Sequence, residues 1–141
     1  HPSGRGVFGC LTFRRTPAII EACESVAKQI GLADKLDTEA GILSHGQKQW
    51  LEIGMILMQE PEVIMLDEPV AGMSVRERQE TAALIRRISE NRSVIVIEHD
   101  MEFVKEIADR VTVMHMGKVI AEGTMETVQK NEKVIEVYIG H

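Results

Sequence analysis

Two adjacent acidic residues, Asp67 and Glu68, follow a short apolar run at residues 63–66. Such a run is typical of a strand buried on both faces, and open α/β sheets bind ligands beyond the carboxyl ends of their strands. Asp67 would suit a hard cation such as Mg²⁺, and Glu68 could then orient or deprotonate a water molecule. The alternative is a strand-end turn in which both acids cap backbone N–H groups. The motif alone leaves both interpretations open.

The segment Leu43-Ser44-His45-Gly46-Gln47 is a second candidate. A serine cap, a glycine that permits close backbone approach and a helix N-terminus together favour binding of an anion such as phosphate. Plain helix capping by Ser44 is the simpler interpretation, with His45 as a surface residue of the first turn.

A third candidate, His99, follows an apolar run at residues 94–97. A histidine at the carboxyl end of a buried strand faces the ligand-binding edge, where it could donate a hydrogen bond to a phosphate or a transition-state oxygen. It could also be a helix-entry residue before Asp100, which is able to cap a helix.

The elements that must position these residues alternate along the chain. Capping residues and apolar spacing predict helices at 17–30, 45–59, 75–91 and 101–109, and a last helical stretch at 124–138. Strands are predicted at 63–66, 94–97, 111–115 and 118–122. This alternation indicates an α/β fold with a mainly parallel sheet, after a helical region in the first sixty residues.

Local patterns also predict which side chains of the helices share a face and which point inward. One face of the first helix carries Ile19, Cys23, Val26, Ala27 and Ile30. The helix after the capping box of Ser74 and Glu77 turns Thr81, Leu84, Ile85 and Ile88 inward. Its arginines form a predicted solvated face: Arg76, Arg78, Arg86 and Arg87. Residues 4–15 show no period and are predicted to be irregular.

The composition excludes several classes of protein. The 141 residues are 44% hydrophobic with a net charge of −6, which favours a folded domain and disfavours a nucleic-acid binder. No apolar run is long enough to cross a bilayer, and no secretory signal is recognisable. Cys10 and Cys23 are too few for a disulfide framework and belong to no metal-binding pattern, so a reducing, cytosolic compartment is expected.

The order and spacing of the motifs resemble the ATP-binding cassette (ABC) ATPase family over residues 16–141. Residues 43–47 look like the signature motif LSGGQ, with His45 in place of its first glycine. Residues 63–68 look like the Walker B strand with the catalytic glutamate, and 71–74 lie where the family has its D-loop. His99 matches the switch histidine of the H-loop.

This resemblance implies the C-terminal part of a P-loop NTPase nucleotide-binding domain. Residues 1–60 would be a partial helical subdomain that includes the signature helix. Residues 61–141 would be the C-terminal part of the ATPase core, with Walker B, the D-loop and the H-loop.

The resemblance also implies a role for each site residue. Asp67 would hold Mg²⁺ through water, Glu68 would act on the attacking water, and His99 would contact the γ-phosphate of ATP. The family sandwiches two ATP molecules between two subunits. The signature residues Ser44, His45, Gly46 and Gln47 would therefore reach the γ-phosphate of ATP bound by the partner subunit. Ser74, where the family more often has Asp, would make a polar contact across that interface.

Finer details are similar to the ATP-binding subunits of urea importers, with branched-chain amino-acid importers next. The segments that carry this likeness are 44–55, 68–74 and 134–140. The resemblance implies that ATP hydrolysis drives the uptake of a small solute, urea first and branched-chain amino acids second. Transmembrane permease subunits would then be partners, and the ATPase would lie on the inner face of the cell membrane.

The sequence contains no GxxxxGK[ST] motif, which supplies the phosphate-cradling loop and its lysine. Phosphoryl transfer depends on positioning and charge stabilisation, so we expect this chain alone to hydrolyse ATP negligibly and to bind neither ATP nor Mg²⁺. The family places the strand before that loop inside its core sheet. We therefore expect open apolar strand edges and self-association.

Two other functions remain open. The chain could be a naturally truncated, non-enzymatic module that docks onto an intact ABC subunit through its signature face. It could also be an unrelated metal hydrolase that uses Asp67, Glu68 and His99, for which a tightly bound transition metal would be the evidence.

Overall fold

A computed structural model describes residues 16–139, and the predicted irregular segment at 4–15 lies outside this part. The chain divides into two units, residues 1–61 and 62–141. Among the described residues, no helix is both long enough and apolar enough to span a membrane.

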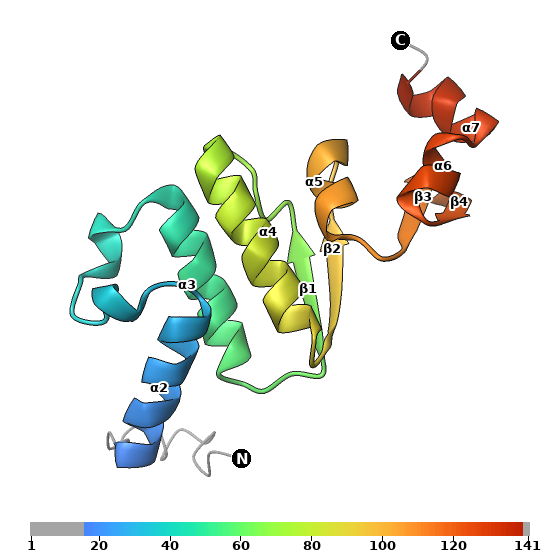
Figure 1. The fold of residues 1–141 in the computed structure, drawn as a ribbon. Coiled ribbons are helices and arrows are strands. Elements are labelled where there is room, and N and C mark those ends of the chain that lie inside the picture. Colours follow the sequence, from blue (N-terminus) through green and yellow to red (C-terminus); the bar gives the residue numbers. More distant parts are fainter. Residues whose placement is uncertain (1–15, 140–141) are drawn as a thin grey trace. The chain divides into compact units, whose positions relative to one another are not determined.

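The described part of the first unit is helical throughout (Figure 1), as predicted. It consists of α2 (Pro17–Gln29), the 3-10 turns η1 (Ala33–Lys35) and η2 (Ala40–Ile42), and α3 (His45–Leu57). Thr16 caps α2, because its side chain accepts a hydrogen bond from Ile19 N at 3.3 Å. Gly31 follows the helix with φ +74°, in the left-handed region that glycine adopts without strain.

Helices α2 and α3 pack closely around a glycine. A Cβ atom at Gly54 would lie 2.6 Å from Ile30 Cδ1 and 3.4 Å from Val26 Cγ1, so a side chain there would displace Ile30. Ala27 and Ile30 are buried as predicted, but Cys23 is exposed. Ile19 and Val26 are half-buried, so burial along this face increases toward the end of α2.

The second unit pairs its first two strands in parallel. β1 (Val63–Asp67) runs beside β2 (Ser93–Ile97), with Asp67 opposite Ile97. The connection is α4 (Val75–Ser89), which packs against β2 and against α5 (Met101–Ile107). The four predicted inward residues of α4 are buried, and its capping box is present. This topology places the carboxyl ends of both strands at one edge.

Only one face of this sheet is buried. Ile64 and Leu66 face the core, whereas Met65 is 64% exposed and Ile97 54% exposed. The whole exposed apolar set is Val63, Met65, Ile95 and Ile97. The prediction that both strands are buried on both faces is therefore wrong. Helix α4 packs against β2 (Figure 1), and the apolar side chains on the other face of the sheet are exposed.

The C-terminal part begins with an antiparallel hairpin. β3 (Val111–His115) and β4 (Lys118–Gly123) are joined by Met116 and Gly117, both with positive φ, as the predicted tight turn requires. Then follow α6 (Met125–Gln129), α7 (Glu132–Val134) and a π-helical turn, η3 (Ile135–Ile139). The described strands thus form one parallel pair, β1 and β2, and one antiparallel pair, β3 and β4. The sequence predicted a mainly parallel sheet.

Candidate functional site

The carboxyl edge of β1 and β2 carries the predicted acids. Asp67 ends β1, and Glu68 follows with φ +46°, a left-handed conformation that few residues other than glycine adopt. Such a backbone typically costs about 1–3 kcal/mol. The Glu68 N–H donates to Ile97 O at 2.9 Å, which ties the strained residue to the end of β2.

Glu68 and His99 lie side by side at this edge. Oε1 of Glu68 is 3.3 Å from Nδ1 of His99, and the side chains are 55% and 79% exposed. Exposed pairs of this kind contribute little to stability. The pair is instead suited to chemistry, because a carboxylate and an imidazole within hydrogen-bond reach of each other are open to solvent and to a substrate. The structure brings these two predicted residues together.

The loop that follows Glu68 is anchored in the core. Pro69, Val70 and Met73 are buried, and Thr81 of α4 donates its hydroxyl to the Met73 sulfur at 3.3 Å. Ser74 then caps α4. Its backbone N–H and its hydroxyl donate to the Glu77 carboxylate at 3.0 and 2.8 Å. The Ser74 side chain is therefore engaged within its own chain, and a contact across an interface stays a prediction.

Sequence reasoning missed the contacts of two residues of this unit, Glu98 and Arg78. The Glu98 side chain, only 2% exposed, accepts hydrogen bonds from backbone N–H groups. Arg78 was predicted to be solvated, yet its side chain is 38% exposed and Nη1 lies 2.6 Å from Oδ2 of Asp100. The signal for Glu98 was an acid placed between an apolar strand and a candidate histidine.

The signature-like segment lies in the first unit. Ser44 caps α3 in a capping box: its side chain accepts from Gln47 N at 3.2 Å, and Gln47 Oε1 accepts from Ser44 N at 3.1 Å. His45 is exposed and Gly46 is buried. The N-terminal turn of α3 is thus ordered by its own side chains, as the capping interpretation predicts. A phosphate contact by this turn remains a prediction.

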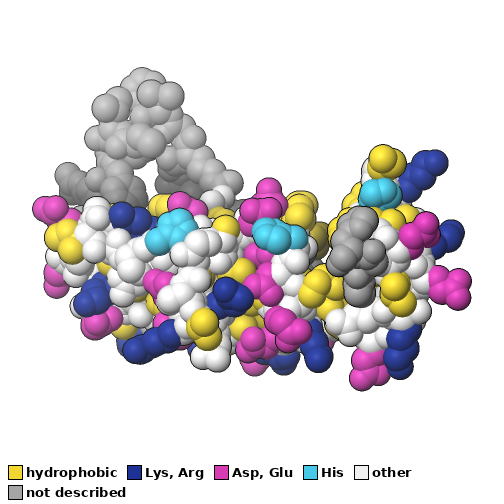
Figure 2. Space-filling view, turned by 90° about the horizontal axis from the view of Figure 1, so that it is seen from above, with side chains coloured by type: hydrophobic (Ala, Val, Ile, Leu, Met, Phe, Trp, Pro, Cys, Tyr) yellow, Lys and Arg dark blue, Asp and Glu magenta, His cyan; other side chains and the backbone are white. Residues whose placement is uncertain are grey.

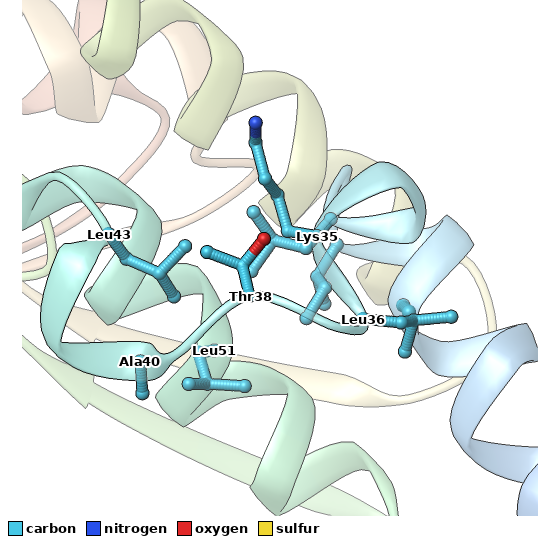
Figure 3. A pocket seen from close by; sticks show the side chains of 9 residues that line it. Lys35, Leu36, Thr38, Ala40, Leu43 and Leu51 are labelled. Atoms are coloured by element: carbon cyan, nitrogen blue, oxygen red, sulfur yellow. The ribbon is translucent and has the colours of Figure 1, made fainter.

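A shallow pocket of about 130 Å³ also lies in the first unit (Figure 3). Its lining is mostly apolar, and it includes Leu36, Leu43 and Leu51. The amino group of Lys35 points away from the other labelled side chains and lies 3.5 Å from Asp34 Oδ2. No predicted site residue lines this pocket.

The donor chemistry at the carboxyl edge is compatible with Mg²⁺. Asp67 and Glu68 are exposed and supply hard oxygen donors. Mg²⁺ typically takes one or two carboxylates and completes its shell with water and substrate phosphates. Among residues 16–139, no group of three His, Cys, Asp or Glu side chains could hold a metal by itself. Figure 2 looks onto this edge and shows acidic and histidine side chains at the surface.

Comparison with solved structures decides the fold. The ADP conformation of MJ1267, described as an ATP-binding cassette of an ABC transporter, superimposes with a TM-score of 0.82 at 28% identity. The match covers 99% of this chain and 58% of that one. The chain has the ABC-type ATPase fold. The predicted fold class is confirmed, over part of the domain.

Sequence comparison agrees with this ABC-type fold. The family described as "ABC transporter" matches residues 6–71, and "Branched-chain amino acid ATP-binding cassette transporter" matches 118–141. BraF of Pseudomonas aeruginosa, a high-affinity branched-chain amino acid transport ATP-binding protein, is 37% identical over 140 residues. LivG of Escherichia coli, which bears the same description, is 36% identical. Each match covers 96% of this chain and 54% of the relative. The chain thus spans about half the length of these curated relatives.

Proposed function

We propose that residues 16–139 form part of an ATP-hydrolysing site of an ABC importer. The observation that carries this proposal is the Glu68–His99 pair, 3.3 Å apart at the carboxyl edge of two parallel strands. In this proposal Glu68 accepts a proton from the attacking water, and His99 donates a hydrogen bond to the γ-phosphate. Asp67 would hold Mg²⁺ through water. When bound, Mg²⁺ neutralises charge on the phosphate oxygens.

The signature segment would complete a second ATP site. Ser44, His45, Gly46 and Gln47 occupy the N-terminal end of α3, where backbone N–H groups and the helix dipole favour a phosphate. In the proposed assembly this end faces ATP held by a partner ATPase subunit, and Ser74 makes a polar contact across the subunit interface. The capping box orders this turn, so Ser44 would have to serve the helix and the phosphate together.

We propose branched-chain amino acids as the transported solute. The named relatives and the match at residues 118–141 support this choice. The sequence resemblance to urea importers has no counterpart in these matches, so urea becomes the second candidate. Permease subunits in the membrane would be the partners of the assembled ATPase.

The decisive experiment supplies the missing phosphate loop. The segment of LivG that precedes its matched region is fused to this chain, and ATP hydrolysis is measured with Mg²⁺ present. The chain alone should hydrolyse negligibly, and the fusion should turn over. Glu68→Gln and His99→Ala should each lower kcat of the fusion at least about 100-fold. Glu90→Gln, an exposed acid at the end of α4, is the matched control.

Two results would contradict the proposal. Robust hydrolysis by the 141-residue chain alone would do so, as would a fusion whose activity survives Glu68→Gln. The solute is tested by uptake of a labelled branched-chain amino acid in E. coli that lacks LivG. A fusion that hydrolyses ATP but restores no uptake would point to another solute, with urea tested next.

A further inference from the structure

Glu98 is a buried carboxylate at the end of β2. Its side chain is 2% exposed, although a carboxylate is costly to remove from water unless it is hydrogen-bonded. His99 Nδ1 lies 3.9 Å from Oε2, beyond hydrogen-bond reach, and Arg78 is engaged with Asp100 instead. The buried charge is therefore met by backbone N–H donors.

The two oxygens of Glu98 serve two different loops. Oε1 accepts a hydrogen bond from Val70 N at 3.4 Å, on the loop between β1 and α4. Oε2 accepts from His99 N at 3.1 Å and from Asp100 N at 3.4 Å, on the loop between β2 and α5. Val70 lies two residues after Glu68. One carboxylate thus holds the loop that carries Glu68 and the loop that carries His99.

We propose that Glu98 is a positioning residue that fixes the separation of Glu68 and His99. The positioning role is argued from hydrogen bonds alone. Only its effect on ATP hydrolysis rests on the proposed function. The hydrogen bond from Glu68 N to Ile97 O fixes one end of the first loop, and Glu98 fixes the same loop again at Val70. Two such attachments hold the strained Glu68 backbone beside the imidazole.

The chemistry of the side chain explains why glutamate is needed. All three partners are N–H donors, so both ends of the side chain must accept. Glutamine has one accepting oxygen and one donating amide nitrogen, and it can therefore hold only one of the two loops. Alanine holds neither. Glu98→Gln should therefore release one loop, whereas Glu98→Ala should release both.

Amide hydrogen exchange in the nucleotide-free, 141-residue chain tests the proposal directly. In Glu98→Ala, exchange at Val70, His99 and Asp100 should accelerate at least about tenfold, because one hydrogen bond at each amide is lost. Exchange within the core of α4 should not change. In Glu98→Gln, only one loop should lose protection. Glu102→Gln, an exposed acid on the first turn of α5, is the matched control and should change neither loop.

The LivG fusion supplies a second readout that a purely structural role would not affect. Glu98→Gln should lower kcat about tenfold or more while the KM for ATP changes little, since the reacting pair is displaced but the nucleotide contacts remain. Unchanged amide protection in Glu98→Ala, or equal loss throughout α4, would overturn the proposal. Because exchange needs no nucleotide, it decides the role of Glu98 even if the fusion proves inactive and the proposed function fails.

Discussion

Nη1 of Arg78 lies 2.6 Å from Oδ2 of Asp100 and joins α4 to the N-cap of α5. The other oxygen of the same carboxylate accepts from Phe103 N at 3.1 Å, and the Phe103 side chain is buried. One aspartate therefore makes an ion pair and a helix cap at once. The two contributions can be separated, because asparagine retains the cap but loses the charge.

Asp100→Ala should lower the free energy of unfolding by about 1–2 kcal/mol, because it removes both the cap and the ion pair. Asp100→Asn should cost less, below about 1 kcal/mol, because the cap remains. Arg78→Ala should lower the free energy of unfolding less in the Asp100→Asn background than in the native chain. Urea unfolding followed by far-UV circular dichroism measures both values. Equal costs of Arg78→Ala in both backgrounds would show that the pair has no coupling energy.

Gly54→Ala should destabilise the first unit by up to about 2 kcal/mol, because overpacking against Ile30 Cδ1 exceeds the gain in helix propensity. Ile30→Val deletes that methyl group. The double variant should therefore be more stable than the sum of the two single effects. Fluorescence of Trp50, the only tryptophan and a buried residue of α3, reports the unfolding. Strict additivity would mean that α2 moves away to accept the new Cβ atom.

Ser44→Ala should lower the free energy of unfolding of the first unit by about 1 kcal/mol, since the Gln47 N–H loses its acceptor. Ser44→Thr, which keeps the hydroxyl, is the control and should recover most of the loss. Urea titrations followed by Trp50 fluorescence measure both variants. A neutral Ser44→Ala substitution would show that this cap does not stabilise the first unit.

Glu122 should make the stability of the hairpin pH-dependent. A hydrogen bond from Arg110, then one from Thr112, and the charge of Arg110 hold the pKa of Glu122 below its ordinary value of 4.5. Because the folded-state pKa is the lower one, the stabilisation is complete above the ordinary value and is lost as pH falls through the lowered pKa.

We therefore expect the urea midpoint of the native chain to fall more steeply on acidification than that of Glu122→Gln. The difference between the two urea midpoints should be widest near neutral pH. It should close as pH falls from the ordinary value of 4.5 through the lowered pKa of Glu122. Glu136→Gln, at an exposed position on η3, is the control and should leave the profile unchanged. Parallel profiles for the native chain and Glu122→Gln would contradict the assignment.

Features that depend on local spacing could be predicted from the sequence. The capping box of Ser74 and Glu77 spans four residues, and the turn at Met116 and Gly117 spans two. The apolar run at 63–66 correctly gave a strand. It could not give the exposure of Met65, because that depends on which element lies against the second face of the sheet.

The exposed groups of the site could be predicted from the sequence, but the buried carboxylate that positions them could not. Asp67, Glu68 and His99 stand at the ends of apolar runs, where side-chain type alone indicates chemistry. Glu98 was not predictable in its role, since its partner Val70 N is a backbone group 28 positions away. Backbone donors leave no mark in a sequence, and only the parallel register of β1 and β2 brings them within reach.

The two strand pairs of the second unit also differ in how soon they can form. β3 and β4 close across the two-residue turn at Met116 and Gly117, a search that typically takes about 1–10 microseconds. β1 and β2 must wait for a connection that contains all of α4, so Val63 meets Ser93 only after a long loop has closed. We therefore expect the C-terminal hairpin to form early in folding. We expect the edge that carries Glu68 and His99 to assemble later, together with α4.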